Sequence, residues 1–124
     1  MYTFTKEERL CNKRLIDSLF HNGSSFLCYP FKVSWRLNNE LGVPAQVLFA
    51  VPKKRFKHAV DRNLLKRRMR EAWRLNKQEQ LYNTLGENKL ILALTYVGKE
   101  IESYELIHKR MIKLLGQITT ELIK

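Results

Sequence analysis

The most chemically distinctive stretch of this sequence, from Lys53 to Arg74, is rich in lysine and arginine. It contains ten basic residues and only two acidic ones, so it carries a net charge of +8 out of +11 for the whole chain. The basic residues are Lys53, Lys54, Arg55, Lys57, Arg62, Lys66, Arg67, Arg68, Arg70 and Arg74. Such a concentration of one charge repels itself unless a polyanion neutralises it, and nucleic acid is the commonest polyanion in a cell. The stretch therefore predicts a nucleic-acid-binding surface.

The spacing within this stretch predicts a helix with one basic face. Residues at four-residue steps lie along one side of an α-helix, and a neighbouring row widens that side. The members of this face are Arg62, Asn63, Lys66, Arg67, Arg70 and Arg74. Leu65, Met69 and Ala72 fall on the opposite side, which predicts an amphipathic helix packed on a core. A merely solvated face usually interleaves the two signs of charge, and this one does not. Residues 53–57 show no apolar periodicity and predict a basic loop that leads into the helix.

The sequence shows no group of residues suited to catalysis by the protein itself. His21, His58 and His108 lie in separate predicted elements, so none forms the helical histidine pair of a metal site. The acidic residues are scattered, without a cluster suited to two metal ions, and no nucleophile–base group or glycine-rich phosphate loop stands out. We therefore predict no catalytic residue, no metal ligand and no cofactor bound by the protein.

Length and composition predict one folded domain, residues 1–124. The 44% apolar content supports a core despite the charge. No apolar run is long enough to span a bilayer, and no signal peptide opens the chain. Cys11 and Cys28 are isolated thiols without metal-ligand spacing, so we expect reduced cysteines and a cytoplasmic protein.

The hydrophobic pattern predicts the element order α-β-β-β-α-β-α. Thr5 and Glu8 fit a capping box that starts a helix over residues 6–20, and Gly23 is predicted to end that helix in the left-handed conformation. The other predicted elements are strands over residues 26–29, 31–37, 45–51 and 90–97, a polar loop with some helical continuation over 76–88, and a helix after Ser103. This order predicts an α/β (α+β) sandwich with a mixed four-stranded sheet and three helices. The crossover through the basic helix would by default be right-handed.

The basic stretch resembles the signature of the bacterial ribonuclease P protein subunit, the small basic partner of a catalytic RNA. The matching residues are Lys53-Lys54, Arg62-Asn63, Lys66-Arg67 and Arg70-Glu71. The family usually has arginine at the position of Leu64, so one contact is either missing or supplied elsewhere, for example by Arg68. Further matches near the N-terminus are Arg9-Leu10, Leu19-Phe20 and Gly23. Ile16 replaces an aromatic residue that is common in the family.

The resemblance implies a ribosomal protein S5 domain 2-like fold with the rare left-handed β-α-β crossover. It also implies that the RNA subunit, with bound magnesium, removes the 5′ leader of precursor tRNA, while the protein binds and positions. The partners would be the ribonuclease P catalytic RNA and precursor tRNA, with no membrane and no small-molecule substrate. The RNA-binding residues would be Lys53, Lys54, Arg55, Arg62, Asn63, Lys66, Arg67, Arg70 and Arg74.

Members of the family hold the single-stranded leader in a cleft between the sheet and the first helix. The residues of such a cleft in this chain would be Ile16, Phe20, Lys32, Ser34 and Arg36. A base would stack on Phe20, with Lys32 and Arg36 as a basic track for the backbone. The residues alone are equally compatible with Phe20 and Ile16 in the core, and the resemblance favours the cleft.

Two other functions fit a basic helix. A ribosomal or other structural RNA-binding protein would stabilise a folded RNA without any part in cleavage. A DNA-binding regulator would place the helix in a major groove, within a compact helical module. The predicted strands around the basic helix disfavour the second of these functions.

Overall fold

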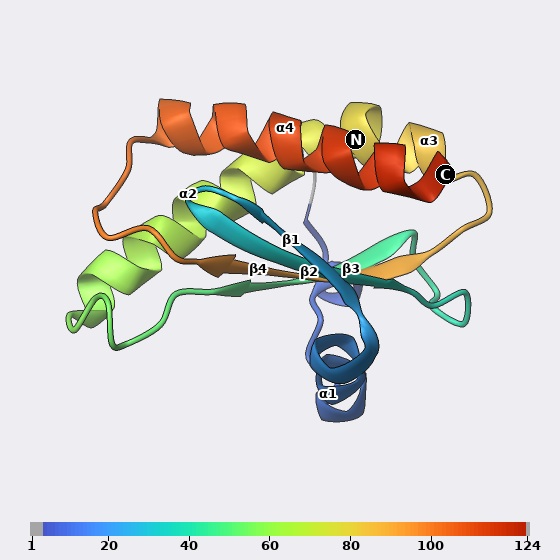
Figure 1. Ribbon diagram of the computed structural model, residues 1–124, viewed down its shortest axis with the longest axis horizontal. Coiled ribbons are helices and arrows are strands. Elements are labelled where there is room, and N and C mark those ends of the chain that lie inside the picture. Colours follow the sequence, from blue (N-terminus) through green and yellow to red (C-terminus); the bar gives the residue numbers. More distant parts are fainter. Residues whose placement is uncertain (1–3, 124) are drawn as a thin grey trace.

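The computed structural model describes residues 4–123, which form a four-stranded sheet with helices on both faces (Figure 1). The strands in chain order are β1 (Ser24–Cys28), β2 (Phe31–Leu37), β3 (Ala45–Ala50) and β4 (Leu90–Tyr96). They lie in the order β1-β2-β4-β3 across the sheet. β2 pairs antiparallel with β1 and β4, whereas β3 and β4 are parallel, so the sheet is mixed as predicted. β2 has the predicted bounds, and the other strands agree with the prediction to within two residues.

Three long helices lie on the two faces of this sheet. α1 (Lys13–Asn22) covers one face, and α2 (Ala59–Lys77) and α4 (Tyr104–Ile123) pack together on the other (Figure 1). The larger buried cluster lies between the sheet and α2 and α4, and a smaller one containing Leu19 and Ile91 lies under α1. The predicted α/β class and element order are confirmed. Among residues 4–123, no helix combines the length and apolar composition that a membrane span requires.

The N-terminal segment contains the predicted capping box but not the predicted helix. Thr5 and Glu8 form the box, yet the turn that it starts, η1 (Lys6–Glu8), is a single 3-10 turn. Leu10 then donates its backbone N–H to the carbonyl oxygen of Val47 on β3, 3.0 Å away. Pairing with a strand edge requires extended backbone, so the helix cannot continue from the box. The capping box is therefore present, but pairing with β3 prevents the helix that it would otherwise begin.

The helix predicted over residues 6–20 is therefore wrong in its first half, and α1 begins only after Asn12. The Asn12 side chain accepts a hydrogen bond from the backbone N–H of Leu15 (3.2 Å), an N-cap that was not predicted from the sequence. Gly23 ends the helix as predicted, but its φ of −79° is not left-handed. Glycine is required there for a different reason, because a Cβ atom would lie 2.9 Å from the carbonyl oxygen of Trp35.

In the polar segment 76–88, the predicted helical continuation extends over most of the predicted loop. α2 runs directly into a π-helical turn, η2 (Gln78–Tyr82), and then into one further turn, α3 (Asn83–Leu85). Leu81 and Leu85 are buried in the larger cluster. Burial of these two leucines stabilises a helical segment whose polar composition had indicated a loop, because most helical stability in proteins comes from tertiary packing.

A buried ion pair fastens the N-terminal segment to the end of α2. Lys77, only 3% exposed, bonds to the carboxylate of Glu8, and the Tyr82 hydroxyl donates to the same carboxylate at 2.6 Å. Burial alone would raise the pKa of Glu8, but hydrogen bonds from Lys77, Tyr82 and the Thr5 backbone outweigh it and hold that pKa below its ordinary value. The sequence pattern contained no indication of this contact.

Candidate nucleic-acid interface

The basic loop before α2 is anchored by one buried aromatic side chain. Phe56 is 7% exposed and packs against Tyr96, with ring centroids 5.7 Å apart. The backbone N–H of Arg55 donates to the carbonyl oxygen of Pro52 (3.2 Å), which closes a turn. The exposed side chains of the loop are Lys53, Lys54, Arg55 and Lys57. The loop thus presents four cations on a backbone that the core holds in place.

Arg62 serves the loop as well as the helix. Its Nη1 atom donates to the carbonyl oxygens of Phe56 (2.8 Å) and Lys57 (2.9 Å). These bonds fasten the end of the loop to the first turn of α2 and leave other guanidinium N–H groups for a further acceptor. Arg62, predicted only as an RNA contact, therefore also has a structural role.

The exposed face of α2 is centred on Asn63, Arg67 and Arg70. Trp73, absent from the predicted apolar side, is fully buried and packs against the rings of Phe49 and Tyr82. The buried side of α2 therefore includes Trp73, and Arg62 and Lys66, two members of the predicted basic row, are half-buried. Within residues 4–123, no acidic side chain forms an ion pair with Arg67 or Arg70.

Two other arginines of α2 are hydrogen-bonded to neighbouring groups of the protein. Arg74 is paired with Glu71 at 2.5 Å, and this hydrogen bond lowers the pKa of Glu71 and raises the pKa of Arg74. Arg68 donates from Nη1 to the carbonyl oxygen of Glu102 (2.5 Å), in the segment before α4. Arg68 thus ties α2 to that segment. The suggestion that it supplies the contact missing at Leu64 gains no support from this geometry.

The five residues predicted for the leader cleft are only partly brought together. Phe20 is 54% exposed, whereas Ile16 packs half-buried on the small cluster under α1. Lys32 and Arg36 are exposed on β2, and the Arg36 guanidinium donates a hydrogen bond to the hydroxyl of Ser18 on α1. Ser34 is 6% exposed, because α1 covers the middle of this strand. Of the residues predicted for the leader cleft, Ser34 is thus covered by α1, whereas Phe20 lies at the surface.

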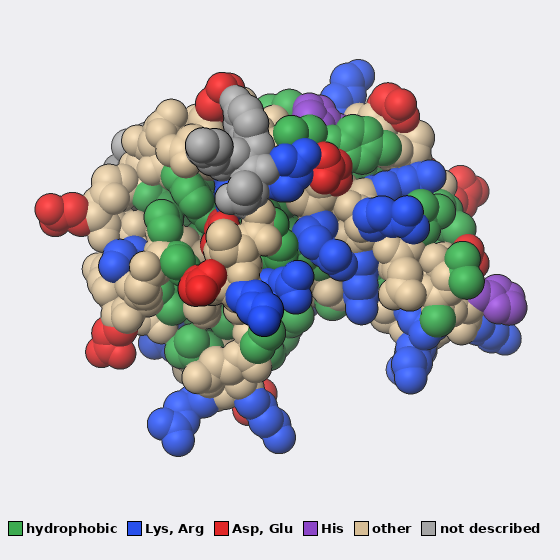
Figure 2. Space-filling model, turned by 180° about the vertical axis from the view of Figure 1, so that it is seen from behind, with side chains coloured by type: hydrophobic (Ala, Val, Ile, Leu, Met, Phe, Trp, Pro, Cys, Tyr) green, Lys and Arg blue, Asp and Glu red, His purple; other side chains and the backbone are tan. Residues whose placement is uncertain are grey.

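A group of exposed cations lies on the side of the molecule formed by α2 and the loop before it. Figure 2 shows Lys and Arg side chains spread over α2 and the loop before it, with a hollow between this region and the protruding α1. Within residues 4–123, no three His, Cys, Asp or Glu side chains are placed to hold a metal ion together. Chemically, this surface is suited to binding phosphates rather than to activating a nucleophile.

The chain is similar to ribonuclease P proteins in sequence and in structure. The family model described as Ribonuclease P matches residues 4–119. The Ribonuclease P protein component of Porphyromonas gingivalis is 33% identical, over 99% of this chain and 94% of that protein. The same component of Chlorobium phaeobacteroides is 38% identical, over 91% of this chain and 86% of that protein. The solved RNase P protein from Thermotoga maritima has a TM-score of 0.71 and 25% identity, over 89% of this chain and 96% of that one.

Proposed function

Because the chain belongs to the ribonuclease P protein family, as a protein component of that tRNA-processing endoribonuclease, we propose that it binds the catalytic RNA through loop 53–57 and the exposed face of α2. The observation that carries this proposal is the group of exposed cations there. Its members are Lys53, Lys54, Arg55, Lys57, Arg67 and Arg70. No ion pair within residues 4–123 neutralises any of them. Phosphates would do so, and the arginines can each direct two N–H groups at one phosphate.

In this proposal the protein is a non-catalytic subunit. The RNA subunit carries the hydrolysis and holds the magnesium, and the cations of α2 reduce the repulsion between the phosphates that surround those ions. The protein would work in the cytoplasm, with precursor tRNA as the substrate of the assembled enzyme. A purely structural RNA-binding role is not favoured by the family match or by the relatives.

The 5′ leader of precursor tRNA would follow the side of the molecule next to α1. Phe20 offers an exposed ring to a base, and Lys32 and Arg36 offer charge to the backbone. Arg36 is already bonded to α1, which positions it beside the helix. Half-buried Ile16 would form part of the floor.

Reconstitution tests the function directly. Precursor tRNA is incubated with the ribonuclease P RNA alone, with this protein alone, and with both at a low magnesium concentration. We expect cleavage at the leader junction to be fastest with both components and absent with the protein alone. A protein that bound the RNA without changing the rate of cleavage would be a structural RNA-binding protein, contrary to the proposal.

Arg67→Ala is expected to weaken assembly with the catalytic RNA by about 1–3 kcal/mol, the range for loss of one charge-assisted contact. The thermal unfolding midpoint should stay unchanged, since the Arg67 side chain is exposed. Arg68→Ala is the matched comparison, because it removes the same charge one residue away. That variant should instead lower the midpoint, through loss of the bond to Glu102. Equal effects of the two substitutions on binding would contradict the assignment of the exposed face.

Phe20→Ala is expected to weaken binding of precursor tRNA to the assembled enzyme by about 1–3 kcal/mol, the range for one base stacked on one aromatic ring. Mature tRNA, which has no leader, should bind as before. Titration of both tRNAs with the two holoenzymes measures the difference. An equal loss for both tRNAs would remove Phe20 from the leader surface.

Leu64→Arg is expected to preserve the fold, because Leu64 is only half-buried and a long cationic side chain can reach solvent from there. The variant should bind the catalytic RNA modestly more tightly, with a slope of log affinity against log salt that is steeper by about one phosphate contact. Salt titrations of the two proteins give this slope. Destabilisation by several kcal/mol would show instead that the position cannot accommodate a charge.

A further inference from the structure

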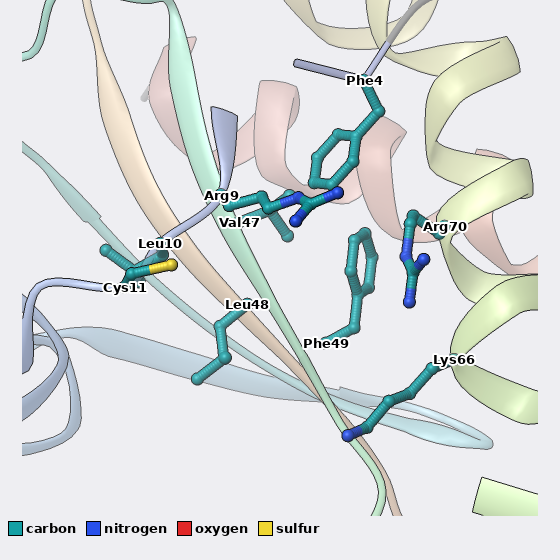
Figure 3. A pocket seen from close by; sticks show the side chains of 9 residues that line it. All are labelled: Phe4, Arg9, Leu10, Cys11, Val47, Leu48, Phe49, Lys66 and Arg70. Carbon is teal, nitrogen blue, oxygen red and sulfur yellow. The ribbon is translucent and has the colours of Figure 1, made fainter. Parts of the chain in front are cut away.

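A small cavity lies at the outer edge of the sheet, between the N-terminal segment, β3 and α2. Its volume is about 240 Å³. The lining residues are Phe4, Arg9, Leu10, Cys11, Val47, Leu48, Phe49, Lys66 and Arg70 (Figure 3). It is distinct from the proposed leader surface, because β4 separates β3 from β2 in the sheet.

The cavity is electropositive. Arg9 reaches into it from the N-terminal segment, and Lys66 and Arg70 reach towards β3 from α2 (Figure 3). None of the acidic residues in the described chain, 4–123, lines the cavity, and the carboxylates of Glu8 and Glu71 are bonded to the side chains of Lys77 and Arg74. Lys66 and Arg70 also stand four residues apart on one helix, an arrangement in which like charges repel until an anion intervenes.

The remaining walls are apolar and partly aromatic. Phe49 meets Phe4 edge to face, with ring centroids 5.8 Å apart, and is backed by buried Trp73 at 6.4 Å. Phe49 and Leu48 are half-buried, so a bound group can still cover them. The cavity is smaller than the about 300–1,000 Å³ typical of sites for drug-sized ligands, which suits one base with its phosphate.

We propose that this cavity takes one unstacked nucleotide of single-stranded RNA, its base against Phe49 and its phosphate between Arg9 and Arg70. Stacking on an aromatic side chain beside a cationic track is how proteins grip single strands. The inference rests on the proposed function, because that function brings two RNAs to this protein. The nucleotide can come from the catalytic RNA or from the leader of precursor tRNA.

Cys11 provides the measurement, since it is exposed and lines the cavity. A bound nucleotide should slow its alkylation by a thiol reagent. Cys28 is the internal control, because it is buried and burial raises the pKa of its thiol, which makes it unreactive. Short single-stranded oligoadenylate is the first probe, with inorganic pyrophosphate as the anion that lacks a base. Stronger protection by oligoadenylate supports the proposal, and equal protection by pyrophosphate overturns it.

Two further arms identify the source of the nucleotide. Protection on assembly with the catalytic RNA alone assigns it to that RNA. Protection only when precursor tRNA is added, and not with mature tRNA, assigns it to the leader. The absence of protection in every arm overturns the inference. The proposed function would survive that outcome if the reconstituted enzyme still cleaved precursor tRNA in a protein-dependent manner, so the two failures are distinguishable.

Matched variants separate the cavity from general charge effects. Arg9→Gln should weaken oligoadenylate binding by about tenfold, the loss of one charge-assisted contact, and restore alkylation of Cys11. Arg14→Gln removes the same charge from an exposed position of α1 outside the cavity and should leave both measurements nearly unchanged. Equal effects of the two substitutions would overturn the proposal.

Discussion

Raising the monovalent salt concentration from about 50 mM to about 200 mM is expected to lower the affinity of this protein for the catalytic RNA by about a thousandfold. Each phosphate that a lysine or arginine neutralises releases condensed counterions, and that release is less favourable in high salt. The loop and the exposed face of α2 present six exposed cations without an ion pair in residues 4–123, so about six phosphate contacts are available. Binding titrations at several salt concentrations give the slope.

Variants make this salt measurement specific to the proposed surface. Removing two cations of the exposed face, as in the double variant Arg67→Ala and Arg70→Ala, should reduce the slope by about two. Removing Lys109, an exposed cation of α4, should leave the slope unchanged. A slope near zero for the unmodified protein would contradict the assignment of α2 as the RNA surface. So would an equal reduction of the slope by the double variant and by the substitution of Lys109.

Lys77→Met is expected to lower the free energy of unfolding by about 3–5 kcal/mol, the range for removing one partner of a buried ion pair. Lys77 and Glu8 are both buried, so the substitution leaves a carboxylate without its ammonium in a site that water hardly reaches. Adding Glu8→Gln should recover most of the loss, because a neutral amide can still accept from Tyr82. Urea unfolding at neutral pH measures both variants.

The pH dependence separates loss of the ion pair from loss of packing. The pKa of Glu8 lies below its ordinary value of 4.5 in the folded protein, so its stabilising contribution is present above pH 4.5 and is lost as the pH falls through the folded pKa. In Lys77→Met the pKa of Glu8 should rise, since burial then dominates. The deficit in stability should therefore shrink in acid, where the carboxyl is protonated in both proteins. A deficit that stayed constant with pH would indicate lost packing.

Local signals alone determined much of this fold. The alternation of Phe31–Leu37 predicted β2 with its observed bounds, since the alternation of apolar and polar side chains along a strand is visible in the order of neighbouring residues. Ser103 caps α4 as predicted, with its Oγ accepting from the Leu106 backbone N–H at 3.2 Å. The concentration of cations between Lys53 and Arg74 by itself indicated a nucleic-acid-binding surface, because an excess of charge of one sign is visible in the composition of a segment.

Tertiary structure decided how those elements are placed and which side chains are free. Pairing of Leu10 with Val47 takes the place of the start of the predicted first helix, and burial of Trp73 belongs to an orientation of α2 in which Lys66 is half-buried. The cation of Lys77 is paired with Glu8, a partner far away in sequence. Each of these outcomes depends on contacts between segments distant in the chain, whose free energies exceed the weak preferences of single residues. The sequence could therefore predict a basic face, but only the packed structure determines which of its charged side chains remain exposed and which are bound by other groups of the protein.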